Sequence, residues 1–173
     1  MSEGDFAISD FALSTQKKFA SKLATTSAIR NRLIDDETQA LFKVIHQIFK
    51  IYFGDKKKAE KLMRDVIKIV VKLGVLQRAE RLNKTILAAA SKKIRNSVMT
   101  FISFHEVEFS FDKKLAVDKM SELVKMIHDL LSSASVKDKT HGRLDNIAAV
   151  KTGLKNRKKS DCFFKNFQLI FAN

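Results

Sequence analysis

The sequence predicts an all-α protein that folds as a single compact bundle of about six helices. The chain of 173 residues contains no proline and only five glycines, whereas folds built on many tight turns usually need more of both. Apolar side chains recur at i, i+3, i+4 and i+7 along several long segments, which is the period of an amphipathic helix. The apolar fraction of 45% is ordinary for a globular protein and argues against wholesale disorder.

Two helices are predicted in the first third of the chain. The first covers residues 6–24, where Phe11 and Phe19 belong to an apolar face and lysines lie elsewhere on the surface. A second helix follows the stretch "IDDETQ". There we expect Asp36 to act as the N-cap, with Gln39 completing a weak capping box, and Gly54 to end the helix.

The third predicted helix, residues 56–79, is unusually apolar. Between residues 66 and 76, eight of eleven side chains are large and apolar. Lys61, Asp65, Lys68 and Lys72 fall within about 60° of arc on a helical wheel, which predicts one narrow solvated stripe. The rest of such a helix must be covered on several sides, either by protein at the centre of a bundle or by something apolar that is not protein.

The second half of the chain continues the helical pattern. We predict helices over residues 82–103 and 113–133, joined by an extended connection at 105–112 where apolar and polar residues alternate. The segment from residue 134 onward has less regular periodicity. Within it, residues 151–160 resemble a solvated basic loop, and residues 162–171 are apolar enough for a last short helix or strand.

The composition favours an anionic partner. The formal net charge is +14, which suits nucleic acid, a membrane surface or a phosphorylated small molecule. A single cysteine, Cys162, excludes an internal disulfide and fits a reducing compartment. No apolar run is long enough to span a bilayer and the N-terminus "MSEGD" is not a signal peptide, so we expect a cytoplasmic protein.

Catalytic and metal motifs are not visible in the sequence. The four histidines are scattered and none has a metal-ligand spacing, so we expect no metal site, no enzyme and no cofactor. Three basic clusters remain, at Lys17/Lys18/Lys22, Arg78/Arg81 and Lys92/Lys93/Arg95. Each either solvates a helix face or joins the others to hold phosphate groups, for which arginine and lysine are suited.

With these segments laid out, the chain resembles the tumour necrosis factor alpha-induced protein 8 family, also called the TIPE family, over residues 11–147. Five segments carry the resemblance in the family's order and spacing: "LSTQKKFASKLA" (13–24), "IDDET" (34–38), "VIKIVVKLGVLQR" (66–78), "IRNSVMTFISFHEVEFSFD" (94–112) and "KTHGRLDNI" (139–147). After Ile147 the family continues with an acidic, aromatic segment and a closing helix, which this chain does not match. The resemblance therefore divides a single domain, residues 1–173, into an N-terminal amphipathic helix and linker (1–30), a helical core (31–147) and a divergent basic and apolar tail (148–173).

The resemblance implies a helical fold likened to a death effector domain of reversed topology, around a long central hydrophobic cavity. It also implies phosphoinositide binding and transfer, and regulation of apoptosis and inflammatory signalling. On that basis Arg78 is expected at the cavity mouth, and Ser91 stands where the family has a second basic residue, with Lys92 or Lys93 as substitutes. Lys17, Lys18 and Lys22 would contact the membrane. The expected apolar lining of the cavity is Ile67, Val70, Val71, Leu73, Leu123 and Ile127.

The sequence and the resemblance leave three functions open. The first is a non-enzymatic phosphoinositide-binding and transfer protein that associates reversibly with the membrane surface. The second is a protein-interaction adaptor in death or inflammatory signalling, with a specific protein partner and a purely structural cavity. The third and most distant is a basic nucleic-acid binder, against which speak the lack of a recognisable motif and the placement of most aromatic residues on expected core faces.

Overall fold

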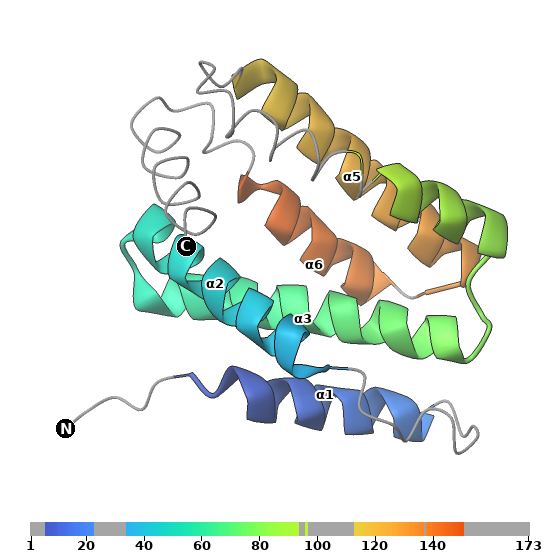
Figure 1. Cartoon of the computed structure of the whole chain (residues 1–173), viewed down its shortest axis with the longest axis horizontal. Coiled ribbons are helices and arrows are strands. Elements are labelled where there is room, and N and C mark those ends of the chain that lie inside the picture. Colours follow the sequence, from blue (N-terminus) through green and yellow to red (C-terminus); the bar gives the residue numbers. More distant parts are fainter. Residues whose placement is uncertain (1–5, 23–33, 94–95, 97–112, 137, 151–173) are drawn as a thin grey trace. The chain divides into compact units, whose positions relative to one another are not determined.

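The computed structural model describes residues 6–22, 34–93, 96, 113–136 and 138–150 (Figure 1). These residues form α-helices joined by turns, and no strand occurs in this part of the chain, which confirms the all-α class. The chain divides into two compact units, residues 1–81 and 82–173, and each is described by itself. The assignment of residues 1–173 to a single domain stays a prediction.

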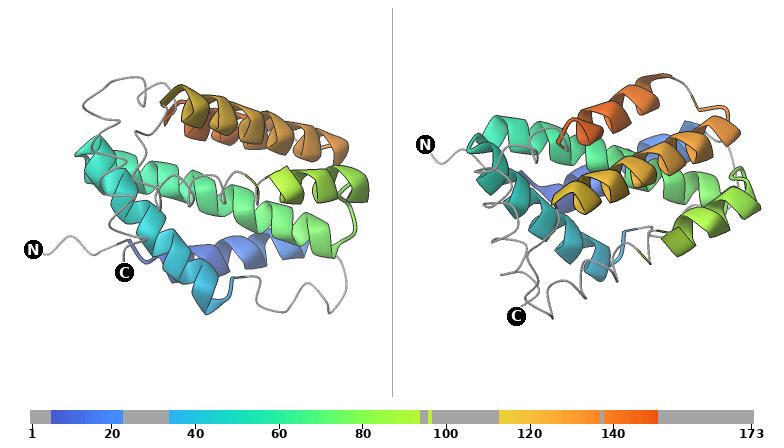
Figure 2. Two further views of the ribbon diagram at one scale, coloured as in Figure 1. Left: turned by 45° about the horizontal axis from the view of Figure 1, so that its top comes forward. Right: turned by 90° about the horizontal axis from the view of Figure 1, so that it is seen from above.

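The first unit contains three helices. These are α1 (Ile8–Lys22), α2 (Asp36–Phe53) and α3 (Lys56–Arg78). Both α1 and α2 pack against α3, which is the longest of the three (Figure 2). The predicted boundaries of all three helices are confirmed to within two residues at the ends that fall in the described ranges, since apolar periodicity and capping residues mark these ends in the sequence.

The N-cap of α2 is Asp35, so the prediction of Asp36 was wrong. Asp35 has an extended backbone and its Oδ1 accepts a hydrogen bond from the Thr38 N–H at 2.7 Å, whereas Asp36 is already the first helical residue. The shift by one residue also removes the capping box, because Gln39 no longer occupies the third helical position. Instead the Gln39 side chain accepts a hydrogen bond from the Ser9 hydroxyl and so links α2 to α1.

Substitution of Asp35 by alanine should lower the free energy of unfolding by about 1 kcal/mol, because one amide at the start of α2 loses its acceptor. Asp35→Asn should retain most of that stability, since asparagine caps equally well. Asp36→Ala should cost less than Asp35→Ala. Urea denaturation of the three variants measures the difference, and a larger loss for Asp36→Ala would show that the cap had been assigned to the wrong residue.

The turn between α2 and α3 is built from two adjacent capping residues. Gly54 has a left-handed backbone (φ 58°) and its N–H donates to the Lys50 carbonyl, which ends α2 as predicted. The next residue, Asp55, accepts hydrogen bonds from the Lys57 and Lys58 N–H groups and begins α3. The two long helices are therefore joined by a tight, fully capped connection.

The expected solvated stripe of α3 is largely covered by α1, so this prediction was wrong for all members except Lys61. Asp65 is buried, and Lys68 and Lys72 are half-buried. The Lys68 Nζ atom lies 5.6 Å from the centre of the Phe11 ring, and the Lys72 Nζ atom lies 5.6 Å from that of Phe19.

Arg64 adds a third cation to this contact. Its Cζ atom lies 4.3 Å from the centre of the Phe6 ring and 4.8 Å from that of Phe11. Cations over aromatic faces are attracted by the negative potential of the ring. Arg64, Lys68 and Lys72, spaced by four residues, thus contact the phenylalanines of the N-terminal segment instead of lying in solvent. We call this contact the cation–aromatic seam.

The core of the first unit lies on the remaining sides of α3. Phe42 of α2 and Met63, Ile67, Val71 and Val75 of α3 are almost fully buried. The face of α2 that carries Phe42 also buries polar side chains. His46 is one of these, and Tyr52 is another, where burial raises the pKa of the phenol above its ordinary value.

The second unit contains a helical segment at residues 84–93, then α5 (Lys113–Ser133) and α6 (Asp138–Ala148). Asn83 caps the first segment by accepting hydrogen bonds from the Thr85 and Ile86 N–H groups. The predicted bounds of α5 are confirmed. The predictions for residues 97–112 and 151–173 lie outside the described residues.

Helix α6 contradicts the expectation of a less orderly segment after residue 134. It packs against α5, and its buried side chains Thr140, Leu144 and Ala148 recur at a spacing of four. The pattern is hard to find in the sequence because only one of the three is a large apolar residue and because Gly142, a poor helix former, lies within the segment. A spacing of four residues is nevertheless the helical signal that marked the other segments.

Candidate functional site

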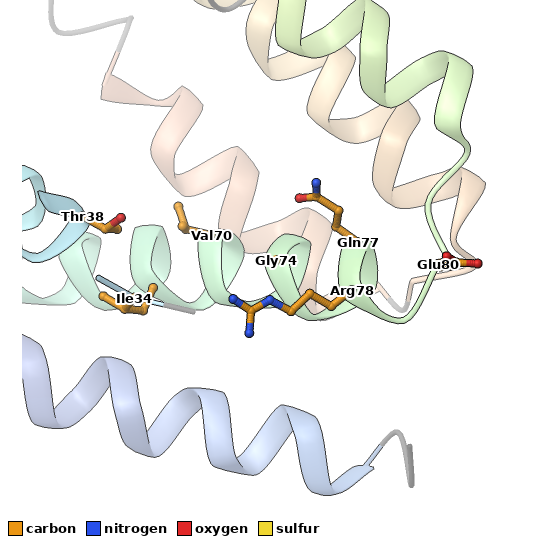
Figure 3. Close-up of a pocket in the computed structure, with 7 residues that line it drawn as sticks. All are labelled: Ile34, Thr38, Val70, Gly74, Gln77, Arg78 and Glu80. Atoms are coloured by element: carbon orange, nitrogen blue, oxygen red, sulfur yellow. The ribbon is translucent and has the colours of Figure 1, made fainter. Parts of the chain in front are cut away.

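The first unit contains a pocket between the start of α2 and the C-terminal half of α3 (Figure 3). Its volume is about 570 Å³, within the range of small-molecule sites, which is about 300–1,000 Å³. Seven of the described residues line it: Ile34, Thr38, Val70, Gly74, Gln77, Arg78 and Glu80. The pocket therefore draws on two segments, residues 34–38 and 70–80, that are close in space but separated in the sequence.

Local sequence explains the shape of the pocket. Gly74 carries no side chain, so the surface of α3 is open at that point, while Val70 lies one turn earlier on the same face. Arg78 is the last residue of α3 and an exposed side chain. Figure 3 shows its guanidinium directed back along α3, past Gly74 and toward Ile34. The cation is thus held over the pocket rather than pointed away from it.

The lining of the pocket is mainly polar, with a smaller apolar part. Val70, which is 39% exposed, provides most of the apolar surface, because Ile34 is only 2% exposed. Thr38 and Gln77 offer a hydroxyl and an amide as hydrogen-bond donors elsewhere in the lining. Glu80, at the far end in Figure 3, adds a negative charge that opposes anion binding. Chemically this arrangement suits the binding of an anionic group attached to an apolar body.

The structure brings together two of the predicted site residues and separates others from them. Arg78 and Val70 line the same pocket. Ile67 and Val71, predicted to line a cavity, are fully buried, and Leu73 is half-buried; none of these three lines this pocket. Leu123 and Ile127 are half-buried on α5 in the second unit. The pocket residues Thr38, Gln77 and Glu80 were not found from the sequence.

Four of the remaining predicted basic residues are exposed. Lys17 and Lys18 are exposed on α1, and Lys22 ends that helix. Lys92 and Lys93 are exposed in the helical segment 84–93 of the second unit, as is Ser91 beside them. Their expected role as phosphate-binding partners of Arg78 stays a prediction.

Two histidines described as scattered in the sequence are in contact in the structure. His128 of α5 and His141 of α6 approach with their Nδ1 atoms 2.7 Å apart, and the Nε2 atom of His128 lies 3.0 Å from Oδ1 of Asp145. The sequence signal that could have found this pair is the helical hairpin of α5 and α6, which was missed together with α6. Within the described residues, no three His, Cys, Asp or Glu side chains form a group that could hold a metal ion.

Among the helices of the described residues, none is both long enough and apolar enough to cross a bilayer.

The comparison with known proteins identifies relatives over most of the chain. The family described as "Tumor necrosis factor alpha-induced protein 8-like" matches residues 6–166, which extends past Ile147, where the resemblance noted in the sequence ends. The tumor necrosis factor, alpha-induced protein 8-like protein 2 B of Danio rerio is 39% identical over 82% of this chain and 77% of its own length.

Mammalian relatives are similar over the same share of the chain. The tumor necrosis factor alpha-induced protein 8 of Bos taurus is 34% identical and that of Homo sapiens 32% identical, in each case over 82% of this chain and 72% of the relative. None of these names states a catalysed reaction. On these matches, the chain belongs to the tumor necrosis factor alpha-induced protein 8-like family.

Proposed function

We propose that this chain is a non-enzymatic protein that binds and transfers phospholipids with phosphorylated headgroups, in particular phosphoinositides. The observation that carries the proposal is the position of Arg78 over a pocket that also exposes the apolar side chain of Val70. A phospholipid offers this combination of an anionic group joined to an apolar body. Family membership adds support, because the sequence resemblance implies the same class of ligand.

The headgroup would be held by Arg78. Arginine binds phosphate through two parallel hydrogen bonds, and a hydrogen bond to a charged group contributes about 1.5–3 kcal/mol. Thr38 and Gln77 supply further donors within the same pocket. We also propose that Lys92 and Lys93, which are exposed in the second unit, attract the phosphorylated headgroup by their charge.

The acyl chains need more apolar surface than Ile34 and Val70 provide. Within the first unit the proposed further contributor is Leu73, which is half-buried on α3. Leu123 and Ile127, half-buried on α5, are proposed as apolar contacts that the second unit makes by itself. Ile67 and Val71 are fully packed in the core and would reach a lipid only if neighbouring side chains moved.

Membrane contact would be made by α1. Lys17 and Lys18 are exposed on this helix, and the whole chain carries a formal net charge of +14. Near an anionic leaflet each basic side chain contributes about 1 kcal/mol, which salt screens. Binding of this kind is peripheral and reversible, and it would place the protein at the cytoplasmic face of a membrane.

The regulatory role is proposed from the relatives. They are named as proteins induced by tumor necrosis factor alpha, an inflammatory signal. Lipid binding by this chain would then act within the regulation of apoptosis or immune signalling, by changing which phosphoinositides are available at the membrane.

Reversal of the two lysines, Lys17→Glu/Lys18→Glu, should abolish flotation with vesicles that contain phosphoinositide. The natural protein should float in proportion to the phosphoinositide content of phosphatidylcholine vesicles. The matched control is Lys57→Glu/Lys58→Glu, which makes the same charge change at two exposed neighbours in the same unit. Because these residues begin α3, glutamate is compatible with the helix there.

Native mass spectrometry of the purified chain completes this test. Co-purified phospholipid, together with flotation lost only in the Lys17/Lys18 variant, is the expected result. Equal loss of flotation in both double variants would show that only the net charge matters. A protein that contains no phospholipid and does not bind phosphoinositide vesicles would refute the transfer function. Phosphorylated headgroup without acyl chains should compete weakly, which also separates lipid from nucleic acid as the anionic partner.

A second candidate function is that of a protein-interaction adaptor, and the exposed apolar residues of α2 favour it. Leu41 is 55% exposed and Ile51 is 45% exposed, while Val44 and Ile45 between them are half-buried. Exposed apolar residues grouped on one helix are a common feature of protein interfaces. Leu41→Ser/Ile51→Ser should leave vesicle flotation unchanged, so a signalling defect in this variant would assign the regulatory role to a protein partner.

A further inference from the structure

The contact between His128 and His141 is a hydrogen bond between ring edges. The two imidazole planes are inclined by only 11° and their centres are 5.0 Å apart, which by itself suggests stacking. However, the Nδ1 atoms are 2.7 Å apart, which is shorter than the contact distance of stacked atoms, about 3.5 Å. The rings therefore lie side by side with their Nδ1 atoms facing each other, and one proton is shared between them.

Asp145 fixes the tautomer of His128. A carboxylate only accepts hydrogen bonds, so the His128 Nε2 atom, 3.0 Å from Asp145 Oδ1, carries a proton. In the neutral ring the Nδ1 atom of His128 is then an unprotonated acceptor. It faces the Nδ1 atom of His141, which supplies the proton of the short contact. His128 is thus held between two residues of α6 that are four positions apart.

This arrangement matches the support that metal-binding histidines usually have. A histidine that ligates a metal commonly donates its other ring N–H to a carboxylate, which fixes the ring and makes the ligating nitrogen more basic. Here Asp145 provides that support and His128 Nδ1 is the nitrogen left for the metal. His141 Nδ1 is a second imidazole nitrogen at the same point, and both histidines are partly accessible to solvent.

We propose that His128 and His141 together bind one divalent transition-metal ion of the zinc and copper class through their Nδ1 atoms, while the proton that they share moves to the Nε2 atom of His141. Imidazole nitrogen suits these ions, with a bond length of about 2.0–2.1 Å to zinc. The two rings must tilt and separate slightly to admit the ion, which their position near the surface allows.

The pair supplies two ligands, and the remaining positions are left to water. No third His, Cys, Asp or Glu in the described residues completes a group for a metal, and Asp145 is engaged behind His128. The site would therefore join α5 to α6 and keep open coordination positions, as in zinc sites that also accept an external ligand. This inference is independent of the proposed lipid function.

The test is calorimetric titration of Zn²⁺ into the full chain, without a histidine tag and with Cys162→Ser as the background so that the lone thiol cannot bind the ion. One Zn²⁺ should bind, and binding should weaken as the pH is lowered because protons compete for the ligand nitrogens. His128→Gln and His141→Gln should each weaken it at least about tenfold, since each removes one of two protein ligands. Lys139→Gln, an exposed residue of α6, should leave it unchanged.

Asp145→Asn provides a second variant that keeps both ligands. It should weaken Zn²⁺ binding by about 10–100-fold, the usual effect of losing a supporting carboxylate. It also leaves the two histidines in place should their replacement disturb the fold, which circular dichroism would reveal. Equal Zn²⁺ affinity in the natural chain and in all three variants, or absence of binding by the natural chain, would overturn the proposal.

Discussion

Replacing Lys68 and Lys72 together by glutamate should release α1 from α3. In the folded protein the two ammonium groups lie over the faces of Phe11 and Phe19, at 5.6 Å from each ring centre. Each such contact contributes about 0.5–2 kcal/mol, more where the groups are shielded from water, as these half-buried lysines are. Glutamate would instead place a negative charge against the negative ring face and would partly bury the new carboxylate.

Hydrogen exchange measures this release directly. The amides of α1 should exchange about 10–100-fold faster in the double variant, which corresponds to the loss of the two contacts. Those of the central turns of α3 should change much less. Lys57→Glu/Lys58→Glu makes the same charge change at the exposed start of α3 and should leave α1 protected. If the amides of α1 exchange at their natural rate in the Lys68→Glu/Lys72→Glu variant, apolar packing alone holds α1 on α3. The cation–aromatic seam then does not stabilise the contact.

The seam illustrates what the sequence could and could not predict about the fold. The helical period and the flanking caps predicted α1, α2, α3 and α5, because both signals are local. The spacing of Lys68 and Lys72 was equally clear, but a lone helix gives no reason to place a lysine under another helix. Its partners, Phe11 and Phe19, are about fifty residues away in the sequence and belong to another element. The helix faces that pack against each other are determined by tertiary structure, and the periodicity of a single helix does not reveal them.

The candidate pocket shows the same division. Arg78 was expected at a cavity mouth and Val70 on its wall, and both line the pocket. Thr38 and Glu80 were missed, since they lie in segments that only the packing of α2 on α3, and the turn after α3, bring to the site. Ile67 and Val71 were expected in the lining because the family resemblance implies a cavity along this apolar helix. Both are fully buried and neither lines this pocket, and apolar character alone does not separate a cavity wall from a packed core.

The histidine pair was missed for a different reason. His128 lies five residues before the end of α5 and His141 three residues after the start of α6, so a helical hairpin brings them side by side. Because α6 was not predicted, the two histidines, thirteen residues apart in the sequence, appeared to be unrelated. One weakly apolar helix was therefore enough to hide a polar cluster.

Reversal of the pocket cation, Arg78→Glu, should reduce the affinity for phosphoinositide vesicles by about 10–100-fold, which corresponds to the loss of one charge-assisted phosphate contact. Among the described residues, Arg78 is the one arginine or lysine that lines the pocket. Glu80→Gln removes the opposing charge from the same pocket and should strengthen binding. The two substitutions thus shift the affinity in opposite directions if the phosphate enters this pocket.

Arg81→Glu separates the pocket from the general charge of the chain. Arg81 is exposed, lies three residues beyond Arg78 and does not line the pocket, so its reversal lowers the net charge by the same amount. Vesicle affinity measured at two salt concentrations should fall far more for Arg78→Glu than for Arg81→Glu. Equal falls that disappear at high salt would show that the vesicles sense only the positive surface, because screening removes long-range attraction but spares a phosphate held within a partly enclosed site. The headgroup would then have to be bound elsewhere than beside Arg78.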